Sequence, residues 1–213
     1  MSYAVKEMFV TLQGEGAQSG ARAVFCRFAG CNLWTGREAD RADAICQFCD
    51  TDFVGMDGQG GGRFADADAL TAAISAIWGD GATGRLVVLT GGEPMLQVDA
   101  PLINALHGAG FRIAIESNGT LAVPRAIDWI CISPKAGSHV VQTSGDELKL
   151  IWPQPGSDWR VMENWAFSHF FVQPMDVADA AQRAANVRAA MAHIHANPRW
   201  RLSLQTHKIL GID

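Results

Sequence analysis

Residues 86–94 read Leu-Val-Val-Leu-Thr-Gly-Gly-Glu-Pro. The first four of these residues are all apolar, which is typical of a strand buried on both faces in a parallel sheet that helices cover. The two glycines that follow let the backbone approach a ligand closely, although an ordinary glycine-rich turn has the same composition. We therefore expect a buried parallel strand with a binding turn at its carboxyl end.

On both sides of this strand, short β-branched or aromatic runs alternate with segments of helical spacing. The expected strands cover residues 5–10, 24–29, 85–90, 112–117, 129–133, 148–152, 169–173 and 200–205. The expected helices cover residues 66–78, 98–107 and 176–195, with Asp66, Asp99 or Asp176 near each start. Repeated strand and helix units predict an α/β fold, namely a partial (β/α) barrel that is shortened relative to a full eight-unit barrel.

The composition indicates a single globular domain over residues 1–213, since 48% of the residues are hydrophobic and 18% are charged. A net charge of -5 argues against a nucleic-acid partner and favours a small-molecule substrate. No apolar run is long enough to span a bilayer, and Lys6 and Glu7 stand where a signal peptide would be apolar. We therefore expect a cytoplasmic protein with no membrane contact.

Three segments interrupt the strand and helix pattern, and each is rich in Gly, Pro or polar residues: 13–21, 32–62 and 154–159. Loops longer than about 12–15 residues usually serve a function or are disordered. The second segment contains Cys46 and Cys49, and Cys31 directly precedes it. We expect a cofactor-binding loop at about residues 31–62.

The cysteines of this loop, Cys31, Cys46 and Cys49, follow the pattern C-x14-C-x2-C. In a reducing compartment, clustered cysteines bind metal or do redox chemistry more often than they form disulfides. Three thiolates on a four-iron cluster would leave one iron open to an exogenous ligand, whereas a zinc knuckle needs a fourth ligand such as His or Asp. The spacing alone leaves both kinds of site open. Cys26 and Cys131 stand in apolar strand runs, where small buried residues are expected.

In these features the chain resembles the radical S-adenosylmethionine superfamily, in which a cysteine loop is followed by a Gly-Gly-Glu-Pro turn. Members usually space the cysteines C-x3-C-x2-C, and the eleven extra residues in the first gap resemble one family among them, the 7-carboxy-7-deazaguanine synthases. The matching motifs cover essentially the whole chain. They are LQGEG at 12–16, FCRFAGCNLW at 25–34, CDTD at 49–52, TGGEP at 90–94, ESNG at 116–119, SPK at 133–135, QPMD at 173–176 and QTHK at 205–208.

This resemblance implies a carbon–nitrogen lyase of deazapurine biosynthesis, on the route to queuosine. The implied reaction is the radical-mediated ring contraction of 6-carboxy-5,6,7,8-tetrahydropterin to 7-carboxy-7-deazaguanine with loss of ammonia. The implied cofactors are a [4Fe-4S] cluster, S-adenosyl-L-methionine and Mg2+. The implied partners are a flavodoxin-like or other electron donor and a second copy of the chain in a homodimer.

The resemblance also implies how the cofactors are held. The three loop cysteines would bind the cluster, and Thr51 would bind magnesium, although Asp50 or Asp52 would be the more natural ligand from the sequence alone. Pro134 and Pro174 could equally be strand terminators. The residues expected to contact S-adenosylmethionine are Phe48, Gly92, Glu93, Ser133, Pro134, Lys135, Gln173, Pro174, Met175 and Asp176.

By the same resemblance, the residues expected to contact the pterin are Leu12, Gln13, Gly14, Glu15, Arg27, Thr90, Glu116, His207 and Asp213. Arg27 alternates with Cys26 and Phe28 along its strand, so it would point inward and bind the substrate carboxylate with its planar guanidinium. A structural ion pair is the alternative for Arg27. Glu15 could merely cap its loop, and His207 could be an ordinary core residue.

Two other classes of protein share part of this pattern. An activase that generates a glycyl radical on a partner would have the same cysteines and glycine turn. It would not need Arg27, Thr51 or the turn at 13–15 for a pterin. A zinc-stabilised binding module would use the cysteines without catalysis and would contain no iron or sulfide.

Overall fold

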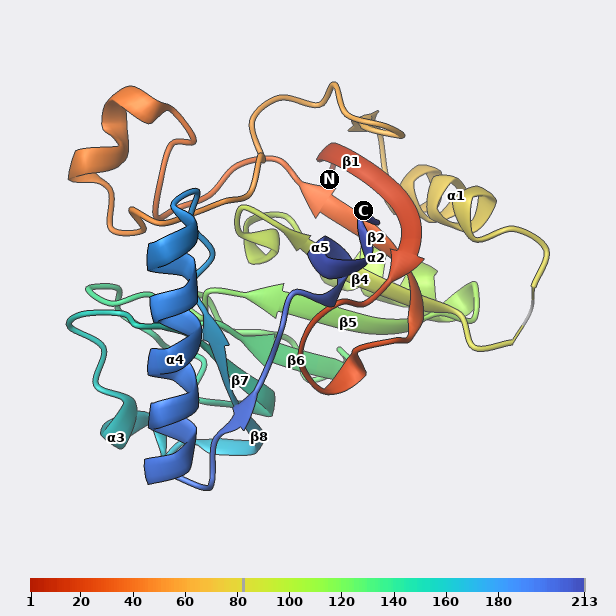
Figure 1. The fold of residues 1–213 in the computed structure, drawn as a ribbon. Coiled ribbons are helices and arrows are strands. Elements are labelled where there is room, and N and C mark those ends of the chain that lie inside the picture. The colour runs from red at the N-terminus through yellow and green to blue at the C-terminus, as the bar shows by residue number, and fades with distance from the viewer. Residues whose placement is uncertain (82, 213) are drawn as a thin grey trace.

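The computed structural model of the chain describes residues 1–81 and 83–212. In this part of the chain, one sheet joins nine strands in the order β3-β1-β2-β4-β5-β6-β7-β8-β9 (Figure 1). The sheet does not close on itself, so the predicted partial (β/α) barrel is confirmed. The strands are β1 (Tyr3–Leu12), β2 (Arg22–Phe28), β3 (Gly62–Phe64), β4 (Leu86–Gly91), β5 (Arg112–Ser117), β6 (Trp129–Ile132), β7 (Ser144–Trp152), β8 (Ala166–Pro174) and β9 (Arg201–Leu202).

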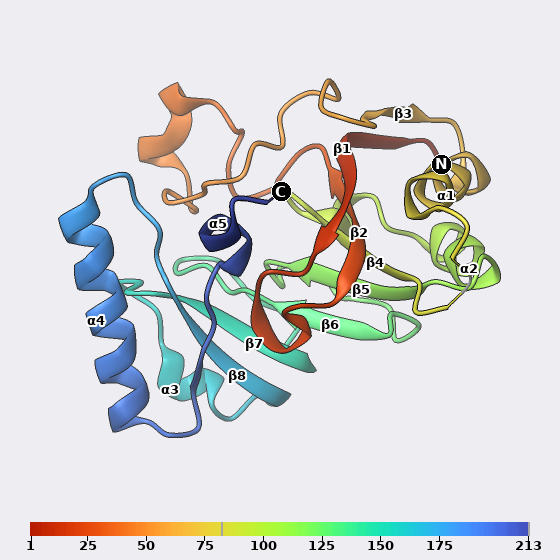
Figure 2. The same ribbon diagram turned by 45° about the vertical axis from the view of Figure 1, so that its right-hand side comes forward.

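The direction of the strands matches the prediction except at one end of the sheet. From β2 through β9 every neighbouring pair runs parallel, as the apolar run at 86–89 predicts. β1 instead pairs antiparallel with both β2 and β3. Figures 1 and 2 show the C-terminal segment, in dark blue, returning to the turn between β1 and β2, where the amide of Thr206 donates to the Gly14 carbonyl at 3.0 Å.

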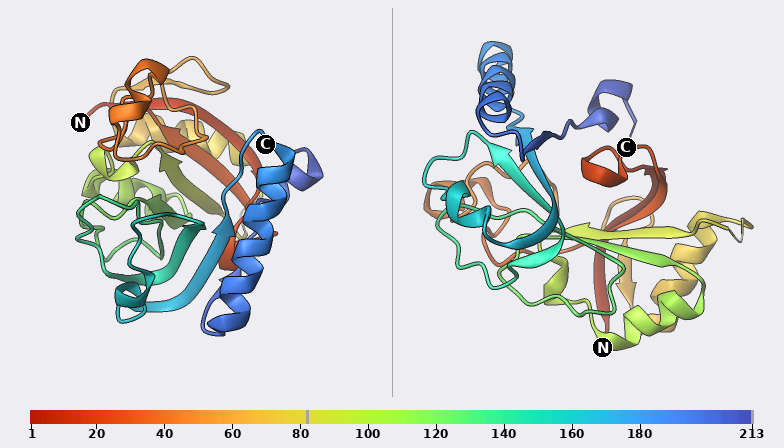
Figure 3. Two further views of the ribbon diagram at one scale, coloured as in Figure 1. Left: turned by 60° about the vertical axis from the view of Figure 1, so that its left-hand side comes forward. Right: turned by 90° about the horizontal axis from the view of Figure 1, so that it is seen from below.

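The three predicted helices are present. α1 (Ala67–Trp78) and α2 (Ala100–Gly108) pack against each other beside the first strands, and α4 (Ala180–Ala196) lies along β8 (Figure 3). Asp66 and Asp99 cap the first two helices by accepting from the backbone amide three residues later, at 2.9 and 3.1 Å. None of the described helices has the length and apolar character needed to traverse a lipid bilayer.

The start of the third helix lies later than Asp176, so that prediction is wrong. α4 begins at Ala180, and Asp179 caps it by accepting from a backbone amide at 2.7 Å. Both aspartates suit a helix start, and the sequence pattern does not choose between caps three residues apart. The elements β3, α3 (Trp159–Met162) and α5 (Thr206–Leu210) have no counterpart in the prediction, because so few residues show no period.

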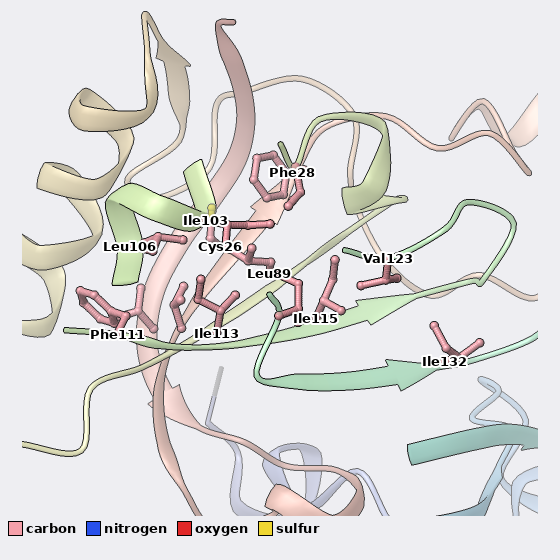
Figure 4. Packing of buried hydrophobic residues seen from close by; sticks show 14 of the residues in the cluster. Cys26, Phe28, Leu89, Ile103, Leu106, Phe111, Ile113, Ile115, Val123 and Ile132 are labelled. Carbon is pink, nitrogen blue, oxygen red and sulfur yellow. The ribbon is translucent and has the colours of Figure 1, made fainter. Parts of the chain in front are cut away.

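The larger part of the hydrophobic core lies on one face of the sheet, called the outer face below. A smaller apolar cluster of Ala23, Leu86, Val88 and Ala114 lies on the other face. Cys26 and Phe28 from β2, Leu89 from β4, and Ile113 and Ile115 from β5 point to this face and pack near α2 (Figure 4). The residues between them along each strand point to the opposite, inner face. The same strands therefore carry a core on one side and the side chains of a candidate site on the other.

Candidate active site

The inner face leads to a cavity of about 350 Å³ at the carboxyl ends of the parallel strands. Thr90 from β4, Glu116 from β5, Ser133 directly after β6 and Gln173 from β8 line this cavity. Ligands bind at this edge in α/β folds, because the ends of several strands and their loops meet there. The turn after β1, the cysteine loop and the C-terminal segment contribute the remaining walls.

The cavity brings together most of the site residues predicted from distant parts of the sequence. Those predicted to contact substrate that line it are Leu12, Gln13, Gly14, Glu15, Arg27, Thr90, Glu116 and His207. Those predicted to contact S-adenosylmethionine that line it are Phe48, Gly92, Ser133, Lys135, Gln173, Pro174, Met175 and Asp176. The predicted metal ligands that line it are Cys31, Cys46, Cys49 and Thr51. Asp213 lies outside the described residues.

Two residues predicted to contact the cofactor, Glu93 and Pro134, lie behind the cavity wall. The fully buried Glu93 carboxylate accepts hydrogen bonds from the Ser117 hydroxyl and the Asn118 amide, both at 2.8 Å. It therefore ties the glycine turn to the end of β5. The carbonyl of the buried Pro134 accepts from the Gln154 side chain at 3.3 Å. A motif marks both positions in the sequence, but the direction of their side chains depends on the packing.

The three thiols of the cysteine loop face the same cavity. Cys31 follows β2, and its sulfur accepts from the Leu33 amide at 3.4 Å. A hydrogen bond from the Cys46 thiol lowers the pKa of Cys49 to about 6, although burial opposes the thiolate. The Lys135 ammonium further favours that thiolate. All three cysteines are free of disulfides, so each sulfur is available as a ligand.

This donor set fits an iron–sulfur cluster better than a single zinc ion. A structural zinc site needs four ligands within about 2.0–2.3 Å of the metal. In residues 1–81 and 83–212, no three His, Cys, Asp or Glu side chains are arranged to hold one metal ion. A four-iron cluster is a larger group, and three thiolates around it leave one iron open.

The other two cysteines are buried in different surroundings. Cys26 lies in the apolar core of the outer face, as predicted. Cys131 is also buried, but it faces the inner side of the sheet, where its thiol donates to the Glu147 carboxylate at 3.5 Å. The expected burial is therefore confirmed for both cysteines, and Cys131 has a polar partner in addition.

The insertion between the first two cysteines folds back onto its own loop. Arg41 donates to the carbonyl oxygens of Gln47 and Cys49 at 3.0 and 3.2 Å. Its guanidinium also lies over the ring of Trp34, at 4.1 Å from the ring centre, and Trp34 meets Phe53 edge to face at 5.6 Å. The insertion thus fixes the backbone that carries the cysteines, a role that no pattern in the sequence indicates.

The Gly91-Gly92 turn is required by packing against the end of β2. A Cβ atom on Gly92 would lie 2.1 Å from the Gly30 carbonyl oxygen and 2.8 Å from Cβ of Cys31. Gly91 has a φ of 133°, and a Cβ atom there would lie 2.3 Å from the Phe28 carbonyl oxygen. The close approach expected of these glycines is therefore made with the backbone around Cys31, so the turn helps to place the first cysteine.

Arg27 faces the cavity from β2, and it also has a structural partner. Its Nε donates to the Glu7 carboxylate at 2.7 Å, and the side chain is 20% exposed. The structural ion pair is therefore present, and binding of the substrate carboxylate by Arg27 stays a prediction. Among the described residues, the two terminal nitrogens of the guanidinium have no hydrogen-bond partner, so they can receive an anion in the cavity.

Thr51 stands between two carboxylates that are already paired. Asp50 meets Lys208 at 2.8 Å, and Asp52 meets Lys6 at 2.9 Å. The hydrogen bond from Lys6 is the main cause that lowers the pKa of Asp52. Because both neighbours are engaged, the pairing argues against either aspartate as the magnesium ligand.

A charged residue of the cavity that sequence reasoning missed is Lys149, on β7. Its ammonium group contacts the carboxylates of Glu15 and Glu116. Burial raises the pKa of Glu15, but Lys149 outweighs burial and lowers that pKa to about 2. The available signal was a lone lysine inside the apolar strand expected at 148–152.

No protein-family model matches the chain. The chain is 59% identical to 7-carboxy-7-deazaguanine synthase of Bordetella pertussis and 58% identical to that of Caulobacter vibrioides, over 212 residues and 100% of both chains in each case. The crystal structure of QueE from Escherichia coli matches with a TM-score of 0.71 at 27% identity, covering 96% of this chain and 94% of that chain. Both kinds of similarity extend over essentially the whole chain.

Proposed function

The chain belongs to the 7-carboxy-7-deazaguanine synthase family, and we propose that its cavity is where 6-carboxy-5,6,7,8-tetrahydropterin is contracted to 7-carboxy-7-deazaguanine with loss of ammonia. As a member of this family it is a radical S-adenosylmethionine enzyme of the lyase class. The observation that carries the proposal is a single cavity that contains three thiols, the guanidinium of Arg27 and the carboxylates of Glu15 and Glu116. A glycyl-radical activase or a zinc module has no use for that combination.

The cofactors proposed for this cavity are a [4Fe-4S] cluster and S-adenosyl-L-methionine. The thiolates of Cys31, Cys46 and Cys49 would hold the cluster, with one iron left open for the amino and carboxylate groups of S-adenosylmethionine. When bound, the two cofactors together supply the radical that abstracts hydrogen from the substrate. The protein holds the reacting groups in place and excludes water from them.

The strand ends that line the cavity would bind the rest of S-adenosylmethionine. Phe48 lies between the second and third cysteines and offers a flat apolar surface for the adenine. The Lys135 ammonium lies 6.0 Å from the centre of that ring and donates to the carbonyl and hydroxyl of Ser133, both at 2.7 Å. The motif at 173–176 supplies a further part of the wall. These contacts would orient the cofactor relative to the cluster.

The pterin would be held at its two ends. Arg27 would bind the substrate carboxylate through its terminal nitrogens while Glu7 holds its Nε. Glu15 and Glu116 would accept hydrogen bonds from the aminopyrimidinone ring at the other end. The walls between them come from Leu12, Gln13, Gly14, Thr90 and His207. Fixing both ends places the reacting carbon without an acid–base pair.

Magnesium is proposed at Thr51, whose hydroxyl would supply one oxygen ligand while waters and substrate complete the octahedron. Support for Thr51 comes from the lysines that pair with both neighbouring aspartates. The flavodoxin-like electron donor, the homodimer and the cytoplasmic location stay predictions.

The test is anaerobic reconstitution with iron and sulfide, followed by turnover of 6-carboxytetrahydropterin with S-adenosylmethionine and a reductant. Mass spectrometry should detect 7-carboxy-7-deazaguanine. Cys46→Ala should lose iron, sulfide and product, whereas the matched control Cys131→Ala should retain all three. Full iron and sulfide in Cys46→Ala, or no product from the reconstituted parent, would contradict the proposal.

A further inference from the structure

Lys149 is a buried cation between the two carboxylates that the proposed function assigns to the pterin ring. Its side chain is 4% exposed, against 14% for Glu15 and 23% for Glu116. Nζ donates to Oε2 of Glu15 and, at 3.3 Å, to Oε2 of Glu116. The ammonium is therefore engaged by two groups of the protein itself.

The second oxygen of each carboxylate is held as well. Gln13 donates to Oε1 of Glu116 at 2.8 Å, and Gln205 donates to Oε1 of Glu15 at 3.1 Å. A carboxylate oxygen has two lone pairs, so each oxygen can still accept from a ligand. The pair is thus fixed by the turn after β1, by the C-terminal segment and by Lys149.

Two ionised carboxylates at one buried position repel each other, and burial raises the free energy of each charge. The other titratable groups around Lys149 are Glu147 on the same strand, Cys131 on β6 and Lys135 beyond it. The first two cannot supply a positive charge, and Lys135 is held at Ser133. Without Lys149, one carboxyl of the pair would take up a proton and become a donor.

We propose that Lys149 is a positioning residue that keeps Glu15 and Glu116 together as a pair of hydrogen-bond acceptors for the N–H groups of a 2-amino-4-oxopyrimidine ring. This inference rests on the proposed function and names the feature that selects the ring. A lumazine carries an oxygen in place of the 2-amino group. It keeps ring N–H groups but would meet one of the two acceptors with another acceptor, and a buried polar group left without its partner is rejected strongly.

The test compares three probes by anaerobic calorimetric titration of the reconstituted enzyme: 6-carboxypterin, 6-carboxylumazine and pterin without the carboxylate. The parent should bind 6-carboxypterin more tightly than either of the others. In Lys149→Met, the preference for 6-carboxypterin over 6-carboxylumazine should fall at least about tenfold. The preference for 6-carboxypterin over pterin, which measures the contact between the carboxylate and Arg27, should not change. A lysine with a merely structural role would lower all three affinities together, and that result would overturn the inference.

A pH series gives a second readout. The parent's preference over 6-carboxylumazine should be constant from about pH 6 to pH 8, because Lys149 holds the pKa of Glu15 far below that range. In Lys149→Met the preference should rise with pH as the shared proton leaves. His207 also lines the cavity and is unchanged in the variant, so its contribution is common to both proteins. A preference that is independent of pH in Lys149→Met would count against the inference.

The double variant Lys149→Met/Glu15→Gln keeps the net charge of the parent group of three residues. It should bind 6-carboxypterin with a low, pH-independent preference over 6-carboxylumazine, and it keeps the inference open to contradiction if Lys149→Met does not fold. An undiminished preference in the double variant overturns the role of Lys149. A parent that does not bind 6-carboxypterin overturns the proposed function instead, so the two failures are distinguishable.

Discussion

Neighbouring residues on β4 and β5 face opposite environments. Leu89 and Ile115 point to the outer face and are completely buried in the hydrophobic core. Thr90 and Glu116, one residue further along each strand, line the cavity. The outer face stabilises the fold by burying apolar surface. Around the cavity the inner face buries polar groups, and a buried polar group lowers the stability of the fold unless it has a hydrogen-bond or ion-pair partner.

This difference shows how the chain keeps charges in its interior. On the inner face Lys149 is paired with Glu15 and Glu116, and Arg27 is paired with Glu7. Buried ion pairs add little net stability compared with apolar packing, although breaking one of them is costly. Substitutions that leave each buried charge a partner should therefore affect mainly binding on the inner face, whereas truncations on the outer face should affect mainly unfolding.

The largest expected effect is that of Ile115→Ala. The side chain is completely buried, so its truncation removes apolar contacts and leaves a cavity. The free energy of unfolding should fall by about 2–5 kcal/mol. Urea denaturation followed by circular dichroism measures this change. The folded variant should keep the parent's preference for 6-carboxypterin over unsubstituted pterin, because Ile115 does not line the cavity.

Glu116→Gln, at the next residue, is the matched control for the comparison. It keeps the size of the side chain and removes a charge that faces the cavity. It should weaken 6-carboxypterin binding while lowering the free energy of unfolding less than Ile115→Ala does. Equal losses of unfolding free energy in the two variants would mean that the two faces do not have separate roles.

The fold could be predicted from the sequence where a pattern is long and regular. The apolar run at 86–89 and the helical spacing over 66–78 and 98–107 predicted elements that are confirmed. The antiparallel direction of β1 could not be predicted, because the run at 5–10 resembles those of the parallel strands. Strand direction depends on the connection between strands, and a single strand carries no local sign of it.

The candidate site could be predicted as far as the motif residues extend. Their partners could not, because those contacts join distant parts of the chain: Lys149 and Glu15 are 134 residues apart, and Lys208 and Asp50 are 158 apart. Glu93 shows that a motif can also mislead: it belongs to a motif that the sequence reveals, but its side chain lies behind the cavity wall. Only the three-dimensional packing determines which face of a turn is presented to a ligand.

Arg27→Lys tests a second charged residue of the inner face. Lysine keeps the charge that pairs with Glu7 but lacks the planar fork that would bind a carboxylate through two nitrogens. Hydrogen bonds to charged groups contribute about 1.5–3 kcal/mol, so the affinity for 6-carboxypterin should fall at least about tenfold. Calorimetric titration measures the loss.

The control for Arg27→Lys is unsubstituted pterin, which lacks the proposed partner. The variant and the parent should bind it almost equally, and the iron content of the variant should match that of the parent. If both ligands are weakened by the same factor, Arg27 is a structural residue that only pairs with Glu7.

A smaller effect is expected from Thr51→Ala, which removes one neutral oxygen from the cavity wall. Water can replace a single oxygen ligand of magnesium, so stimulation of turnover by magnesium should fall by no more than about tenfold. The absorption spectrum of the cluster should stay unchanged. Thr35→Ala is a matched control in the same loop, since its hydroxyl bonds Asp40 at 2.7 Å outside the cavity. An unaltered magnesium response in Thr51→Ala would remove Thr51 from the site.

The smallest effect concerns His193, which packs away from the cavity against Trp152 and Trp159 at ring distances of 4.4 and 4.7 Å. Within the described residues its Nε2 is buried without a hydrogen-bond partner, and burial lowers the pKa of its ring. Below about pH 6.5, the ordinary pKa of histidine, the unfolded chain therefore binds more protons, so stability is lost as the pH falls. His193→Phe keeps a ring and removes the titration, so its melting temperature should fall less between pH 7.5 and pH 5.5 than that of the parent. Equal falls in the two proteins would show that the buried ring does not contribute to the pH dependence, because the two proteins differ only at this residue.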